Sequence, residues 1–87
     1  MNKDTDLLVK KIIILIESLN ETENPTVKFF YGVIEKIKNC GNEKELKSVL
    51  DDHLIHAGKI KDYGGFSLEQ CSLFNDMWKV AKNIYEA

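Results

Sequence analysis

The chain has 87 residues, of which 44% are hydrophobic and 30% charged, and its formal net charge is −2. This composition is typical of a soluble globule and excludes a collagen-like, low-complexity or disordered chain. The length allows one small domain, residues 1–87, and excludes a Rossmann or barrel scaffold. Twelve basic residues, all Lys, face fourteen acidic ones, so the chain has no basic field for nucleic acid.

The cysteines and the N-terminal sequence favour a cytoplasmic protein. Cys40 and Cys71 are the two cysteines and form no Cys-x-x-Cys pair, whereas small secreted domains carry more cysteines in a framework. The apolar run 12–16 ends at Glu17, which makes it too short for a membrane span, and no cleavage site of small residues follows it. We therefore expect no membrane segment and no signal peptide.

The first predicted helix covers about residues 6–20, with Asp4 or Thr5 as its N-cap. Residues at helical spacing form its buried stripe: Leu8, Ile12, Leu15, Ile16 and Leu19. Other apolar residues spread around the helix: Leu7, Val9, Ile13 and Ile14. The β-branched run would also suit a strand, but the length of the pattern favours a helix.

The second predicted helix covers about residues 26–39. Asn24 is the expected N-cap, Pro25 suits the first helical position, and Gly41 is expected to end the helix in a left-handed conformation. Its core stripe is Val27, Phe30, Tyr31, Ile34 and Ile37. A second stripe of Phe29, Val33 and Cys40 on an adjacent face predicts that this helix is buried on two sides.

The third predicted helix begins with a capping box formed by Asn42 and Glu45, and Gly58 ends it. Its core residues are Leu46, Val49, Leu50, Leu54 and Ala57. Residues 59–65 form the longest irregular stretch between helices, and the pair Gly64–Gly65 is expected to make a turn there.

The last predicted helix begins with the capping box Ser67–Gln70, and Phe66 is placed to pack on Cys71 as a hydrophobic staple. Its inner face consists of Cys71, Phe74, Met77, Trp78, Ala81 and Ile84. Because three independent helix starts agree, we expect an all-α fold, a compact bundle of four helices with a radius of gyration of about 12 Å.

One group of side chains has the residue types of a metal site. Asp52, His53 and His56 share a face of the third helix, and Asp62 in the following loop would supply a fourth ligand. The chain has no His-Glu-x-x-His motif, so a zinc hydrolase would lack its base. The favoured interpretation is that His53 packs against the core while Asp52 and His56 form a solvated pair, with no metal or other cofactor.

The remaining candidates do not favour catalysis. Cys40 lies at a helix C-terminus, which raises a thiol pKa, and Cys71 lies on a predicted inner face. The carboxylate pairs 51–52 and 43/45 lack the apolar surroundings that would separate their pKa values. We therefore expect that the chain is not an enzyme and has no catalytic residues.

Apolar residues exceed what one face of each helix needs. The surplus comprises Phe29, Val33, Ile55, Ile60, Tyr63 and Tyr85. Surplus apolar surface on a small domain often marks a partner site, in which aromatic side chains supply much of the binding energy. A better-packed core than the helical spacing suggests would account for the same residues, and both interpretations stay open.

In length, arginine-poor acidic composition and helix order the chain resembles small helical bacterial immunity proteins, such as those of Maf-type and contact-dependent toxin systems. The segment Leu50–Leu54, the loop to Gly65–Glu69 and the final helix contribute to this resemblance, which includes no diagnostic motif and transfers no individual residue. It implies a protein that neutralises a bacterial toxin. A net charge of −2 is small for a cover over a basic nuclease site, so the toxin's activity stays open.

The leading hypothesis is a protein-binding inhibitor that occludes the active site of one specific protein partner, a toxin domain. Acidic side chains would steer the encounter and aromatic ones would anchor it. The expected partner-binding residues are Glu43, Asp51, Asp52, His56, Asp62, Tyr63 and Phe66. The alternatives are a phage- or plasmid-type regulator that binds a host protein, with a homodimer formed through residues 7–19, and a metal-dependent enzyme using Asp52, His53 and His56.

Overall fold

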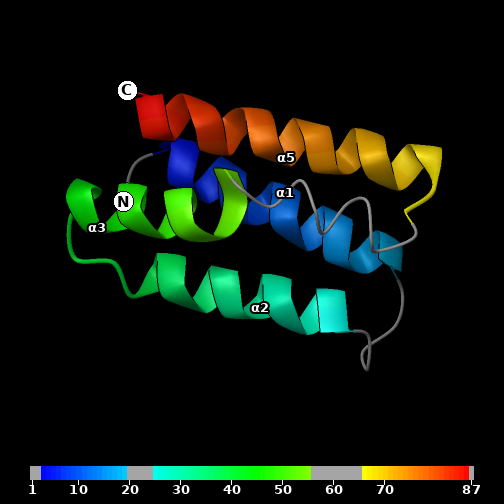
Figure 1. Cartoon of the computed structure of the whole chain (residues 1–87), viewed down its shortest axis with the longest axis horizontal. Helices are drawn as coiled ribbons and strands as arrows, with labels where there is room; N and C mark the ends of the chain where they lie inside the picture. Colours follow the sequence, from blue (N-terminus) through cyan, green and yellow to red (C-terminus); the bar gives the residue numbers. More distant parts are fainter. Residues whose placement is uncertain (1–2, 20–24, 56–65, 87) are drawn as a thin grey trace.

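Each of the four stretches with helical apolar spacing forms an α-helix in the computed structural model, which describes residues 3–19, 25–55 and 66–86 (Figure 1). The helices are α1 (Lys3–Leu19), α2 (Pro25–Lys38), α3 (Glu43–Leu50) and α5 (Leu68–Glu86), and α3 continues directly into a π-helical turn, η1 (Asp51–Ile55). These ranges contain no strand. The predicted all-α bundle of four helices is confirmed, and the radius of gyration, 12.1 Å, matches the expected value.

Consecutive helices run in opposite directions along the bundle, so the start of α1 and the end of α5 lie at the same end (Figure 1). α1 packs against α5 and α2, and α3 packs against α2 and α5, so that α1 and α3 are diagonal to each other. This is the arrangement that short connections between amphipathic helices favour. No helix in the described part of the chain combines the length and the apolar content needed to cross a membrane.

The buried side chains form one core that follows the predicted stripes closely. Its hydrophobic members are Leu8, Ile12, Leu15, Ile16, Val27, Phe30, Val33, Ile34, Ile37, Leu46, Leu50, Leu54, Phe74, Met77, Ala81 and Ile84. Phe30 of α2 meets Phe74 of α5 edge to face, with ring centroids 6.4 Å apart. Four predicted core residues are only half-buried: Leu19, Val49, Cys71 and Trp78.

Tyr31 was expected in the core of α2, and this prediction is wrong, because the side chain is 56% exposed. The buried stripe of α2 advances by steps of three and four residues through Phe30, Val33 and Ile37. Tyr31 follows Phe30 by one residue, which turns it about 100° away from that stripe. Val33, expected on a second face, belongs to the core instead and is 2% exposed.

The start of α1 also differs from its prediction. The helix begins at Lys3, so Asp4 and Thr5 lie inside its first turn and neither is the N-cap. Thr5 is 1% exposed, because it precedes Leu8 by three residues and Ile12 by seven and so extends the buried stripe by one turn. Asp4 keeps a favourable place, since a carboxylate in the first turn complements the helix dipole.

The connection between α2 and α3 is closed by hydrogen bonds rather than by a left-handed glycine. The φ angle of Gly41 lies outside the left-handed region, so the predicted left-handed conformation is wrong. The N–H of Cys40 donates to the carbonyl of Ile37 (3.2 Å), which ends α2 in a tight turn. Asn42 caps α3 as predicted, because its Oδ1 accepts the N–H of Glu45 at 2.9 Å. The reciprocal bond differs from a standard capping box: the Glu45 carboxylate accepts the N–H of Gly41 (2.7 Å), which is one residue before the cap.

The start of α5 confirms the capping box at Ser67 and Gln70. The Gln70 side chain accepts the Ser67 N–H at 2.9 Å, and the Ser67 hydroxyl accepts the Gln70 N–H at 3.1 Å. Gln70 Nε2 also donates to the carbonyl of Ser18 (3.0 Å), which ties the start of α5 to the end of α1. Phe66 packs its ring against Phe74, with centroids 6.2 Å apart.

The third helix was predicted as α-helical to Ala57, but its α-helical part ends at Leu50, where the π-helical turn η1 begins. Leu46, Leu50 and Leu54 are all buried although they are spaced four residues apart. In a regular α-helix each four-residue step drifts by about 40° around the axis. The wider π turn rotates less per residue, which offsets this drift and keeps Leu54 in the core. Ala57 and Gly58 lie outside the described residues.

Candidate functional site: the groove between α2 and α3

Of the seven partner-binding residues predicted from the sequence, four lie within the described part of the chain. Glu43 is the exposed first residue of α3, Asp51 is half-buried at the start of η1, and Asp52 beside it is exposed. Phe66 precedes α5, and its half-buried ring packs on the core. His56, Asp62 and Tyr63 lie outside the described residues. The structure therefore brings the three acidic residues onto one continuous helical segment, α3–η1.

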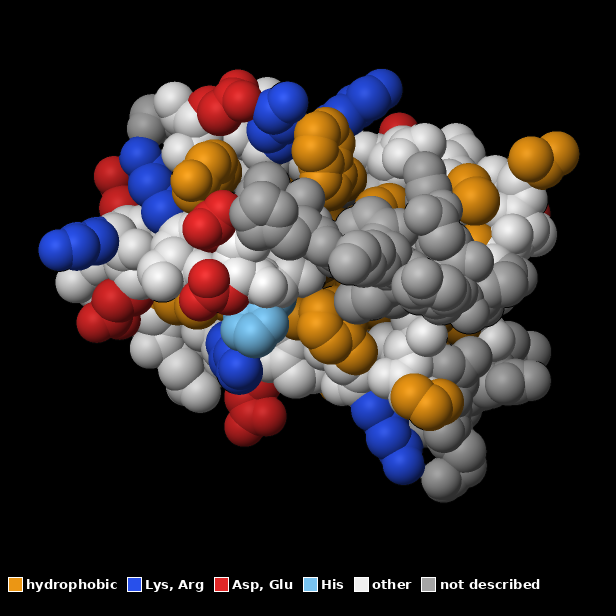
Figure 2. All heavy atoms as spheres, viewed as in Figure 1, with side chains coloured by type: hydrophobic (Ala, Val, Ile, Leu, Met, Phe, Trp, Pro, Cys, Tyr) orange, Lys and Arg blue, Asp and Glu red, His pale blue; other side chains and the backbone are white. Residues whose placement is uncertain are grey.

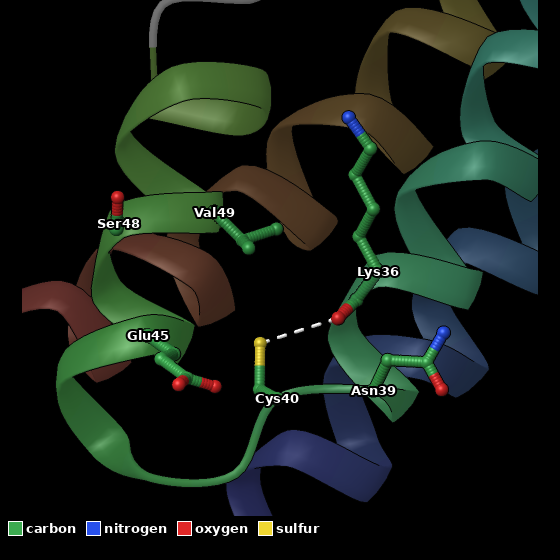
Figure 3. Close-up of a pocket in the computed structure, with 6 residues that line it drawn as sticks. All are labelled: Lys36, Asn39, Cys40, Glu45, Ser48 and Val49. Carbon is green, nitrogen blue, oxygen red and sulfur yellow. Dashed lines mark hydrogen bonds between the residues drawn. The ribbon is translucent and has the colours of Figure 1, made fainter.

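Two adjoining hollows lie along the seam between α2 and the segment α3–η1. One has a volume of ≈ 390 Å³ and is lined by Lys36, Asn39, Cys40, Glu45, Ser48 and Val49 (Figure 3). The other has a volume of ≈ 240 Å³ and is lined by Lys28, Phe29, Gly32, Val33, Lys36 and His53. Lys36 lines both hollows, and we call the pair the α2–α3 groove.

His53 lines the smaller hollow and contacts α2 from the turn η1. Lys36 Nζ lies 3.2 Å from His53 Nε2, and because an ammonium group can only donate, Nε2 is the acceptor in this hydrogen bond. Phe29 meets the imidazole edge to face, with centroids 6.3 Å apart. His53 therefore contacts α2 through both Lys36 and Phe29.

Cys40 lies two residues beyond α2 and lines the larger hollow, where its Sγ donates to the carbonyl of Lys36 at 3.2 Å (Figure 3). Burial raises the pKa of the Cys40 thiol, and the nearby carboxylate of Glu45 raises it further. The direction of the shift agrees with the sequence prediction, although burial and Glu45 are the causes in the structure. The thiol is therefore held in its protonated, weakly nucleophilic form.

The metal cluster considered from the sequence is only partly within the description. Asp52 is exposed and His53 turns towards α2, whereas His56 and Asp62 lie outside the described residues. Across residues 3–19, 25–55 and 66–86, no group of three or more His, Cys, Asp and Glu side chains could hold a metal ion.

Apolar side chains also reach the surface away from the groove. The large exposed ones are Leu7, Ile13, Ile14, Tyr31, Leu68 and Tyr85. On the face seen in Figure 2, acidic and basic side chains intermix at the end where α3 begins, and hydrophobic groups emerge between charged ones in several separate places. Of the surplus apolar residues, Phe29 packs against the core and Val33 belongs to it, while Ile60, Tyr63 and the side chain of Ile55 lie outside the description.

The sequence contained one signal for the groove. The predicted second stripe of α2, made of Phe29, Val33 and Cys40, supplies much of one wall. Lys36 and Val49 were not singled out as site residues, because a lysine on a polar face and a valine at core spacing have no distinguishing pattern.

Comparisons of the chain with protein-family models, with curated proteins and with solved structures found no match.

Proposed function

We propose that this chain is a protein-binding inhibitor, of the kind that neutralises a bacterial toxin by covering its active site. One observation carries the proposal: the segment α3–η1 exposes Glu43, Glu45 and Asp52, and Glu45 lines a groove whose walls include apolar side chains. Acidic side chains near a hollow that offers some apolar contact combine two features that protein interfaces use.

The two features have different physical roles. Exposed carboxylates accelerate encounter with a basic surface and set its orientation, whereas a hollow that removes a side chain from water supplies affinity. In the α2–α3 groove the half-buried Phe29 and Val49 offer apolar contact. The lysines of α2 give the opposite wall a positive character, so a partner with one basic and one acidic edge would fit in a single orientation.

The state of the nucleophilic groups supports binding over catalysis. The Cys40 thiol is held protonated by burial and by Glu45, and His53 already accepts a hydrogen bond from Lys36. A general base must have a free lone pair within reach of the proton that it removes. These contacts favour a passive surface over a reaction centre in the groove.

The proposal is tested by affinity capture of the tagged chain from its native host, followed by binding measurements with the purified partner. We expect one stoichiometric partner with toxic activity that the chain inhibits. Glu43→Lys and Asp52→Lys should each weaken binding about tenfold, chiefly by slowing association. Asp76→Lys is the matched control, because Asp76 is also exposed but lies on α5.

Three outcomes would count against the inhibitor. Equal binding by all three variants would show that the acidic side chains of α3–η1 are not in the interface. Capture of transcription or replication machinery would favour the regulator. A partner that keeps its full activity when saturated with the chain would contradict occlusion of an active site.

A further inference from the structure

The outward face of α1 carries large apolar side chains that the bundle does not cover. Leu7 is 42% exposed, Ile13 39% and Ile14 44%, although the opposite face of the same helix is fully buried. α1 lies diagonally across the bundle from α3, so this face points away from the α2–α3 groove. It therefore needs an explanation separate from the proposed inhibitor surface.

Two charges flank the isoleucines symmetrically. Lys10 precedes Ile13 by three residues and Glu17 follows Ile14 by three, and both charged side chains are exposed. Residues three and four apart share a helix face, so the four side chains form one surface. Within the described residues neither Lys10 nor Glu17 forms an ion pair, although the exposed Asp6 lies four residues before Lys10, and the positions three and four before Glu17 are the two isoleucines.

We propose that this face is the interface of a symmetric homodimer in which two copies of α1 pack antiparallel. A two-fold axis between Ile13 and Ile14 places Lys10 opposite Glu17 of the partner subunit, and the second Lys–Glu pair forms by symmetry. Each charge lies about 5 Å along the helix from the axis, so both pairs close around the central isoleucines. A parallel pairing would instead set like charges against each other, which disfavours it.

The charge pattern is what selects a second copy as the occupant, since the face is complementary to itself. One helix pair buries less surface than a stable dimer usually needs, so the association is weak and depends on concentration. Because α3 lies diagonal to α1, the dimer leaves both α2–α3 grooves open. The homodimer and the proposed inhibitor function use different surfaces, so an experiment that contradicts one of them leaves the other standing.

Sedimentation equilibrium over a range of concentrations tests the proposal. The wild-type mass should rise from 10.0 kDa towards twice that value. Lys10→Glu and Glu17→Lys should each weaken association about fivefold or more, because each change turns two attractive pairs into repulsive ones. The double variant Lys10→Glu/Glu17→Lys should restore it, whereas Lys79→Glu on α5 should have no effect. A constant mass of 10.0 kDa at every concentration, or an association constant that does not change in the charge-reversal variants, overturns the proposal.

Cross-linking distinguishes the antiparallel register from a parallel one. In a Cys40→Ser/Cys71→Ser background, Ile14→Cys should cross-link with a bifunctional maleimide that spans about 10 Å, the separation of packed helices. Leu7→Cys should not, because antiparallel pairing separates its two copies by about 20 Å along the axis. Equal cross-linking at both positions would show a parallel arrangement and overturn the proposed register.

Discussion

Gln70 is expected to stabilise the fold more than an exposed helix residue normally does, because its side chain joins two helices. Its Oε1 accepts the N–H of Ser67 at 2.9 Å and its Nε2 donates to the carbonyl of Ser18 at 3.0 Å. Gln70→Ala removes both bonds but leaves the Ser67 hydroxyl free to cap the Gln70 backbone N–H.

The magnitude follows from these two bonds. Each contributes a net amount of about 0.5–1.5 kcal/mol, and alanine regains a few tenths of a kcal/mol through its higher helix propensity. Gln70→Ala should therefore lower the free energy of unfolding by about 1–2 kcal/mol, which corresponds to about 5–15 °C in Tm for a domain of this size.

Urea unfolding followed by circular dichroism measures this change. Asn75→Ala is the matched control, since it removes an exposed amide from the middle of the same helix and should change the stability by less than about 0.5 kcal/mol. Gln70→Glu separates the two bonds, because it keeps the acceptor for Ser67 and faces Ser18 with an oxygen instead of a donor. The reasoning would be refuted if Gln70→Ala matched Asn75→Ala, and the link to Ser18 in particular if Gln70→Glu matched the wild type.

Two further predictions concern the core and the groove. Leu50→Ala should lower the free energy of unfolding by about 2–5 kcal/mol, because Leu50 is fully buried. Leu68→Ala is the control and should change the free energy of unfolding by less than about 0.5 kcal/mol, because Leu68 is 92% exposed. Similar urea midpoints for the two variants would contradict the packing described. Because the fold raises the pKa of Cys40 above its ordinary value of 9.0, the unfolded chain loses the thiol proton first, and stability should fall as the pH rises through that range. Cys40→Ser should flatten this dependence of stability on pH. In a Cys71→Ser background, Glu45→Gln should speed alkylation of Cys40. An unchanged alkylation rate would show that Glu45 does not raise the pKa of the Cys40 thiol.

The helices and most of the core were predictable because local chemistry and tertiary packing agree. The caps at Asn42 and Ser67 were identified from side chains that satisfy the first free N–H groups of a helix, and the structure forms both. Apolar spacing likewise placed Phe30 and Phe74 in the core. Such features depend on residues close in the sequence, so the sequence alone reveals them.

The errors arose where distant parts of the chain decide the outcome. Tyr31 has a core-like side chain but lies about 100° past the stripe that meets the other helices. Thr5 looks like a cap, yet packing of α1 against its neighbours extends the helix back past it. The bond from Gln70 to Ser18 joins residues 52 apart, and no local pattern predicts it.

The candidate site was less accessible to sequence reasoning than the fold. The acidic residues of the segment α3–η1 were identified from charge alone, but the groove beside them depends on how α2 and α3 pack. The π-helical turn also affects it, since a longer α-helix would place His53 differently relative to Lys36. A prediction that extends the α-helix to Ala57 therefore cannot anticipate the bridge between His53 and Lys36.

The most direct test of the proposed function is a map of the binding surface by NMR, with the isotope-labelled chain titrated with its purified partner. The account predicts that backbone amide signals shift most on α3–η1 and on the facing side of α2, around Glu45, Asp52 and Lys36, while those of α5 near Asp76 change little. Shifts concentrated on α5, or no shifts at a saturating concentration of the partner, would contradict it.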